Sequence, residues 1–407
     1  MKLQLLITAL LAGIFLSACS DSNNDKESGD TSCATPASTT FFRPFALDSE
    51  DYPFCSCAFQ TAFGRIHYFD DGPRDAGETI LMVHGNPTWS FLYRNIAKAM
   101  IEDGHRVIAL DHLGMGMSDV PLTSEFDYRP RSHADNLEDL VVALDLQNVT
   151  LVVQDWGGPI GLGMATRQHE RISGILIMNT WAWSIDAENP GDYHELMAWT
   201  KQAKSFSSIS PTFFCDFLLP GQSELNALAA DPSRGAFYER VLAAYLSPAI
   251  DPTTGDYRTS EPGAAMQIFA ESIGDDDAFQ GEVEGRMGNL RGKSYSLLFG
   301  LSDQLFGALR CNMALDPPCP NGTTCVCDDE LLPSRVKGGC SDPAASEFHV
   351  CKSSDGSIID PYADRFVEIL GTENLVNREV VPDADHMIQE EAPERVIQAL
   401  RKLLDHS

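Results

Sequence analysis

The chain has 407 residues, of which 29 are Lys or Arg and 59 are Asp or Glu, so its formal net charge at pH 7 is −30. Hydrophobic residues make up 43%, which excludes an intrinsically disordered chain, and the acidic balance argues against a nucleic-acid partner because phosphate binding needs clustered basic residues. The 11 cysteines favour an oxidising compartment.

The N-terminus predicts an export signal with a lipid anchor. The apolar run 5–16 is shorter than the roughly 20 residues that span a bilayer. It ends in Leu16-Ser17-Ala18-Cys19, which resembles the bacterial lipobox, so we expect residues 1–18 to be removed and Cys19 to be acylated. The alternative is an ordinary signal peptide cut near Ala18. The polar residues 19–40 predict a flexible tether, and the protein is expected to be an exported bacterial lipoprotein on the periplasmic or extracellular face of a membrane.

A core of alternating strands and helices follows the tether. Residues 64–70 alternate in polarity like an edge hairpin strand. Continuous apolar runs typical of strands buried on both faces occur at 79–85, 106–111, 149–155 and 172–179. Helical patterns at 91–100 and 131–144 lie between them, so the sequence predicts a mostly parallel sheet covered by helices, with reactive groups at the carboxyl ends of its strands.

Asp155 stands on the predicted turn between a buried strand and a helix, in Val153-Gln154-Asp155-Trp156-Gly157-Gly158. This is the position of the nucleophile in the Gly-x-nucleophile-x-Gly elbow, although Val153 replaces the first glycine. A carboxylate can attack an sp³ carbon without help from a base, which gives an ester that water then hydrolyses. Two reactions suit this scheme: displacement of a halide and opening of an epoxide. A serine or cysteine hydrolase is not expected.

The alternating pattern stops after residue 182. Residues 183–290 are helical in pattern, rich in Ala and Phe and without clear strands, which predicts a helical cap inserted into the core. Strand patterns resume at 294–300 and 376–381, and an amphipathic helix is expected at 394–404.

Six cysteines lie in a polar segment that has no helical or strand period: Cys311, Cys319, Cys325, Cys327, Cys340 and Cys351. We expect disulfides there, with the pairing left open, since six cysteines allow 15 connectivities. A zinc site that uses Cys325, Cys327 and His349 is the alternative. Cys33, Cys55, Cys57 and Cys215 are expected to form two more disulfides, although Cys55 and Cys57 are too close in sequence to pair comfortably.

The motif His84-Gly85-Asn86-Pro87-Thr88-Trp89, together with Asp155-Trp156-Gly157-Gly158, closely resembles the haloalkane dehalogenases of the α/β-hydrolase superfamily. The resemblance implies an α/β-hydrolase fold with a helical cap, and it leaves out the Cys-rich insertion, which is therefore expected as an addition to that fold. It implies that Asp155 is the nucleophile, that the side chains of Trp156 and Asn86 bind the departing halide, and that the backbone N–H groups of these two residues form the oxyanion hole. The substrate would be a small apolar halogenated molecule, with water as the second reactant. Trp89, Trp181 and Trp183 are candidate pocket walls.

The resemblance also implies a base and an acid. His386 lies after the last predicted strand and matches the family's catalytic histidine, although Asp385 stands where a glycine is more usual. Asp303 ends the preceding strand and matches the acid of the third dehalogenase subfamily. Other subfamilies place the acid at the position that Asn179 occupies here, and an asparagine cannot stabilise a cation as a carboxylate does.

Two other functions remain open. An epoxide hydrolase would use the same Asp, His and Asp with a cap tyrosine over Asp155, for which the sequence offers Tyr193, Tyr238, Tyr245 and Tyr257. A non-catalytic binding module is the third possibility. No cofactor is expected, because the glycines at 114–116 lack a dinucleotide-binding context. No metal is expected, because the spacing of Cys325, Cys327 and His349 suits zinc poorly and the compartment is oxidising. The predicted units are a signal peptide (1–18), a tether (19–40), the core (41–182, 291–310 and 357–407), the cap (183–290) and the Cys-rich insertion (311–356).

Overall fold

The computed structural model describes residues 49–186, 277–303, 350–382 and 384–407, with residues 16–17 and 47 and short stretches between 191 and 273 and between 305 and 340. Cys19, the tether and most of the predicted cap lie outside the described residues. None of the described helices is both long and apolar enough to cross a membrane.

A nine-stranded sheet is the centre of the described structure, with the strand order β1-β2-β3-β5-β4-β6-β7-β8-β11. Its strands are β1 (Leu16–Ser17), β2 (Ser56–Gln60), β3 (Arg65–Asp71), β4 (Thr79–Val83), β5 (Arg106–Leu110), β6 (Val149–Gln154), β7 (Ile172–Met178), β8 (Ser294–Gly300) and β11 (Leu375–Val381). The first three pairings are antiparallel and the others are parallel, which confirms the mostly parallel sheet.

The prediction that residues 64–70 form an edge strand is wrong. β3 lies between β2 and β5, and five of its seven residues are buried. Its alternation was misleading because His67 and Asp70 are polar but buried, where each has a charged partner: His67 contacts Asp111, and Asp70 contacts Arg106. β1 falls within the segment that the sequence predicts to be removed as a signal peptide.

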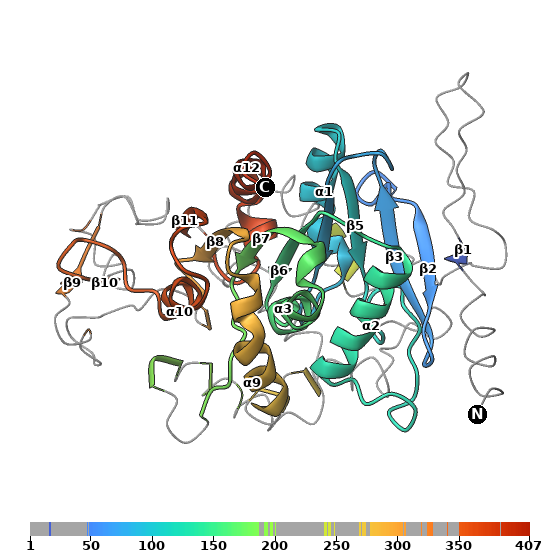
Figure 1. Cartoon of the computed structure of the whole chain (residues 1–407), viewed down its shortest axis with the longest axis horizontal. Helices are drawn as coiled ribbons and strands as arrows, with labels where there is room; N and C mark the ends of the chain where they lie inside the picture. The colour runs from blue at the N-terminus through green and yellow to red at the C-terminus, as the bar shows by residue number, and fades with distance from the viewer. Residues whose placement is uncertain are drawn as a thin grey trace.

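Helices cover both faces of the sheet, as a parallel sheet requires. α1 and α12 pack together on one face, and α2 and α3 pack together on the other (Figure 1). The described helices are α1 (Arg94–Glu102), α2 (Pro130–Ala143), α3 (Gly157–Arg167), α9 (Asp277–Arg286), α10 (Pro361–Leu370), α11 (Ile388–Glu391) and α12 (Pro393–Leu404), with a 3₁₀ turn, η2 (Ser90–Tyr93), before α1.

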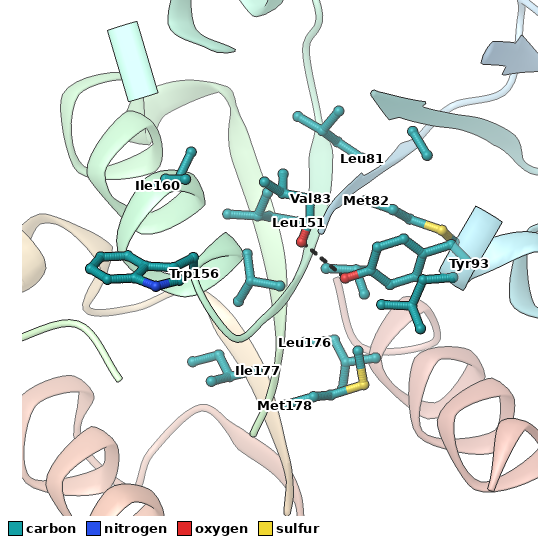
Figure 2. Packing of buried hydrophobic residues seen from close by; sticks show 14 of the residues in the cluster. Leu81, Met82, Val83, Tyr93, Leu151, Trp156, Ile160, Leu176, Ile177 and Met178 are labelled. Atoms are coloured by element: carbon teal, nitrogen blue, oxygen red, sulfur yellow. Dashed lines mark hydrogen bonds between the residues drawn. The ribbon is translucent and has the colours of Figure 1, made fainter. Parts of the chain in front are cut away.

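The core fills the space between the strands and these helices. Figure 2 shows aliphatic side chains of β4, β6 and β7 packed between Trp156 and Tyr93. Each such side chain contributes about 1.5–3 kcal/mol when it is fully buried. The hydroxyl of Tyr93 donates a 2.9 Å hydrogen bond to the carbonyl of Val83, so the core also fixes the end of β4, where the loop over Asp155 begins (Figure 2).

The Cys-rich insertion contains disulfides, as predicted. Cys319 bonds to Cys351 and Cys327 bonds to Cys340, and Cys325 is also disulfide-bonded. Because these sulfurs are oxidised, the zinc alternative that used Cys325 and Cys327 is wrong. Disulfide bonds likewise hold Cys55 and Cys57.

Two short strands of the insertion, β9 (Thr324–Val326) and β10 (Val350–Lys352), which the sequence did not predict, pair antiparallel beyond α10 (Figure 1). Val350 packs against Leu301, two residues before Asp303. The insertion is therefore anchored to the loop that carries the predicted acid.

Candidate active site

Asp155 occupies a sharp turn between β6 and α3. Its φ of +52° lies in the left-handed region that L-residues other than Asn, Asp and Gly rarely adopt. The turn is tight enough that a Cβ on Gly157 would lie 2.1 Å from the carbonyl oxygen of Val83. Val153, which replaces the first glycine of the elbow pattern, is accommodated by Gly161 in α3, because a Cβ there would lie 2.7 Å from a methyl group of Val153.

The loop after β4 holds one oxygen of the Asp155 carboxylate. The backbone N–H of Asn86 donates a 2.6 Å hydrogen bond to Asp155 Oδ1. Gly85 permits this approach, since a Cβ on it would lie 2.3 Å from Asp155 Oδ1 and 2.7 Å from the backbone nitrogen of Trp156. The N–H of Asn86 therefore already contacts Asp155 Oδ1, and the oxyanion hole expected from the N–H groups of Asn86 and Trp156 stays a prediction.

His386 lies between two carboxylates. Its Nδ1 is 2.9 Å from Asp303 Oδ2, and its Nε2 is 3.4 Å from Asp155 Oδ2. Asp303 is held by the backbone N–H groups of Leu305 and Phe306, which both donate to its Oδ1. The three side chains that the sequence separates by more than 80 residues are thus in contact, and all are buried.

The pKa of His386 is raised to about 10. Burial acts to lower this pKa, but the charges of Asp303 and Asp155 and their hydrogen bonds favour the protonated ring and outweigh burial. The two carboxylates thus favour the protonated ring, and the pKa of His386 would fall if Asp155 lost its charge.

Asp385 stands where a glycine is more usual in the family, and it stabilises the loop that carries His386. Its Oδ1 accepts a 2.9 Å hydrogen bond from the backbone N–H of His386, and its own backbone N–H donates to Glu391 of α11.

Asn179 has a positioning role that the sequence did not reveal. It follows β7 with a φ of +37°, and its backbone carbonyl accepts from the N–H of Asp155. Its side-chain Nδ2 donates to the carbonyls of Asp385 and His386, and its Oδ1 accepts from the N–H of Gly300. One buried asparagine thereby joins the three strand ends that carry Asp155, Asp303 and His386. Its position after a predicted strand was the signal available beforehand.

Aromatic rings form a continuous row of contacts from Trp156, next to Asp155, to His386. Trp156 contacts Trp181, with ring centroids 4.7 Å apart, and Phe269, with centroids 5.7 Å apart. Trp181 stacks on Phe306, which stacks on His386. Trp181 is therefore beside the site, as predicted, whereas Trp89 packs on Tyr52 and Phe91 and Trp183 packs on Phe366, within the core.

A buried ion pair holds the segment that follows His386. Arg94, which is 1% exposed, forms a two-pronged pair with Glu390, four residues after His386. The hydroxyl of Tyr245 donates to the same carboxylate. The part of the chain that the structure describes contains no group of three or more His, Cys, Asp or Glu residues able to hold a metal ion.

Comparisons with known proteins show what the chain is similar to. A family model described as the α/β-hydrolase fold matches residues 78–259. Haloalkane dehalogenase 2 of Mycobacterium bovis is 38% identical over 180 residues, which cover 44% of this chain and 60% of the relative. A cis-3-alkyl-4-alkyloxetan-2-one decarboxylase of Shewanella oneidensis is 46% identical over 127 residues, which cover 31% of this chain and 39% of the relative. The chain therefore spans less than two thirds of the length of these relatives.

Solved structures extend the likeness in fold to most of the chain. The haloalkane dehalogenase of Paraglaciecola agarilytica matches with a TM-score of 0.56 at 20% identity, covering 89% of this chain and 98% of that protein. A haloalkane dehalogenase of Agrobacterium tumefaciens matches with a TM-score of 0.52 at 18% identity, covering 89% of this chain and 100% of that protein. These matches, with the family model, confirm the α/β-hydrolase fold, and the sequence match to the Mycobacterium bovis protein confirms the resemblance to haloalkane dehalogenases.

Proposed function

We propose that this chain, a relative of the haloalkane dehalogenases with the α/β-hydrolase fold, hydrolyses carbon–halogen bonds of small apolar molecules to an alcohol and a halide. One observation carries the proposal: the two oxygens of Asp155 have different partners. Oδ1 accepts from the backbone N–H of Asn86 at 2.6 Å, while Oδ2 faces His386 Nε2 at 3.4 Å.

In the first step, Oδ2 of Asp155 attacks the carbon that carries the halogen. A C–O bond forms as the carbon–halogen bond breaks, and the electron pair leaves with the halide. Trp156 and Asn86, both buried beside Asp155, are the proposed side-chain donors to that halide. Weak hydrogen-bond donors suit a halide in a site without water, because an exposed halide would bind water strongly instead.

In the second step, water hydrolyses the ester at Cγ of Asp155. His386, after losing its Nε2 proton to solvent, takes a proton from the attacking water as the oxygen bonds to Cγ. Negative charge then develops on Oδ1, beside the N–H of Asn86. Collapse of this intermediate expels the alkoxide, which takes the proton from His386 and leaves as the alcohol. Asp303 holds the ring through Nδ1 in both directions of transfer.

Halide release from a brominated alkane is the direct test. Asp155→Asn should abolish it, because the amide cannot displace the halide. His386→Gln should trap the ester, so that peptide mass spectrometry finds an alkyl group on Asp155. If wild-type protein consumes the bromoalkane but the alkyl group appears on another residue, the proposal is wrong.

A second function is favoured by the Shewanella oneidensis relative. Its name describes loss of carbon dioxide from a four-membered cyclic ester, and its matched region has the higher identity of the two relatives described. In such a ring a carboxylate could serve as the leaving group in place of a halide. Release of carbon dioxide from a dialkyl-oxetanone, with no halide release from any bromoalkane, would replace the first proposal with this one.

Epoxide hydrolysis has less support. The hydroxyl of Tyr245 donates to Glu390, and the ring of Tyr193 packs on Trp183 and Tyr362. Tyr238 and Tyr257 lie outside the described residues. Diol formation from styrene oxide without halide release would favour this alternative.

The membrane anchor is also a proposal. The lipobox-like sequence before Cys19 supports acylation of that cysteine in an exported bacterial lipoprotein. Metabolic labelling with palmitate should tag the wild-type protein and leave Cys19→Ala untagged, and an untagged wild type would exclude the anchor.

A further inference from the structure

Gln154, the last residue of β6, lies against the imidazole of His386. Its side chain is fully buried, with Nε2 3.1 Å from the carbonyl oxygen of His386 and 3.2 Å from the ring Nε2 of the same residue. A carbonyl oxygen only accepts hydrogen bonds, so the amide nitrogen of Gln154 must face it. The same NH₂ group then directs its other hydrogen at the ring.

Two neighbours favour opposite protonation states of Nε2 of His386. Asp155 Oδ2, at 3.4 Å, is an acceptor and favours a proton on Nε2. The amide hydrogen of Gln154 needs a lone pair there and favours the unprotonated ring nitrogen. At the opposite side of the ring, Nδ1 donates to Asp303 Oδ2 in either state.

The charges around His386 decide whether its Nε2 is protonated. The carboxylates of Asp155 and Asp303 contact the ring from the ends of β6 and β8, and Asp385 accepts from its backbone N–H. Glu391 of α11 contacts the backbone of Asp385, and the neutral Phe306 stacks on the ring. Alkylation of Asp155 is the step that removes one of these charges, and it leaves the amide group of Gln154 beside Nε2.

We propose that Gln154 is a positioning residue that holds His386 in its unprotonated base form once Asp155 has become an ester, and thereby sets the pH range of ester hydrolysis. The proposal rests on the Asp155–His386 mechanism above. The hydrogen bond to the backbone carbonyl positions the loop, whereas the hydrogen bond to Nε2 is made only to the base form. Loss of the second bond therefore has a titration signature that a purely structural role lacks.

The test measures the pKa of His386 by NMR in protein labelled with ¹⁵N-histidine, in the background Asp155→Asn, whose neutral side chain stands for the ester. Gln154→Met keeps the length of the side chain but removes the donor, and it should raise the pKa of His386 by about one unit. Gln154→Glu replaces the donor with a charged acceptor and should raise the pKa further. The matched control is Gln280→Met in α9, another buried glutamine, which should leave the pKa unchanged.

In the background with Asp155 intact, Gln154→Met should move the acidic limb of the kcat profile for halide release to higher pH by a similar amount, with little change in KM. An unchanged pKa in Gln154→Met, with the Nδ1–H signal of His386 still present, overturns the proposal. If that variant does not fold, Gln154→Asn, which withdraws the amide by one methylene, gives the same readout. Absence of halide release from every substrate would overturn the proposed function, but the NMR result would still report whether Gln154 controls His386.

Discussion

Removal of the Asn179 side chain should destabilise the fold strongly, because its amide joins three segments of the proposed site. Asn179→Ala deletes three buried hydrogen bonds of 2.8, 3.1 and 2.9 Å, to the carbonyls of Asp385 and His386 and from the N–H of Gly300. Each is worth about 1 kcal/mol, and each buried group left without a partner costs about 1–3 kcal/mol before relaxation. Alanine also tolerates a φ of +37° less well than asparagine. We expect a loss of about 3–5 kcal/mol.

Urea unfolding followed by circular dichroism measures this change, and Asn148→Ala is the matched control. Asn148 also has a left-handed φ, of +51°, but it is exposed, and its Nδ2 donates to the carbonyl of Gly77 at 2.7 Å. The control should therefore lose about 1–2 kcal/mol, and the difference reports the buried network. Halide release should also fall by about 10²-fold in Asn179→Ala, because the base and the nucleophile lose their common anchor. An equal loss of unfolding free energy in Asn179→Ala and Asn148→Ala would show that the buried hydrogen bonds of Asn179 do not add to stability.

Three further predictions concern the same site. Gly85→Ala should nearly abolish halide release, because the new Cβ would lie 2.3 Å from Asp155 Oδ1 and must displace the nucleophile; activity and circular dichroism together check this. His386 has a folded-state pKa raised from 6.5 to about 10, so its stabilising contribution should be complete below pH 6.5 and disappear as the pH rises through 10, which Tm measured across this range would detect. Glu390→Gln should cost about 3 kcal/mol in urea unfolding, because the buried Arg94 loses its charged partner.

Each of these has a control. Gly285→Ala adds a methyl group where nothing lies within 4 Å, and it should preserve halide release; an active Gly85→Ala would contradict the close approach. Asp155→Asn should narrow the pH range over which Tm falls, and an unchanged range would show that Asp155 does not raise the pKa of His386. Glu368→Gln removes the exposed pair with Arg365 and should cost less than about 1 kcal/mol; a similar cost for Glu390→Gln would mean that the buried pair contributes little.

The sequence by itself determined the sheet and predicted which residues would carry the chemistry. Unbroken apolar runs ending at His84, Asp155 and Asn179 predict strands buried on both faces, because only such strands need apolar side chains on every residue. The parallel arrangement then places all their carboxyl ends at one edge. Asp155 ends such a run, whereas Asp303 and His386 follow the strand patterns at 294–300 and 376–381, so their predicted convergence depends on the strand pattern and on the resemblance to a known family.

Tertiary structure alone decided which polar groups face one another. β3 reads as an edge strand because His67 and Asp70 are polar, and only the fold supplies the partners that bury them. The hydrogen bonds of Asn179 and Gln154 join segments more than 200 residues apart, and a sequence pattern holds no information about such contacts. Local propensity and periodicity depend on neighbours along the chain, whereas the orientation of a catalytic side chain depends on groups that folding brings together.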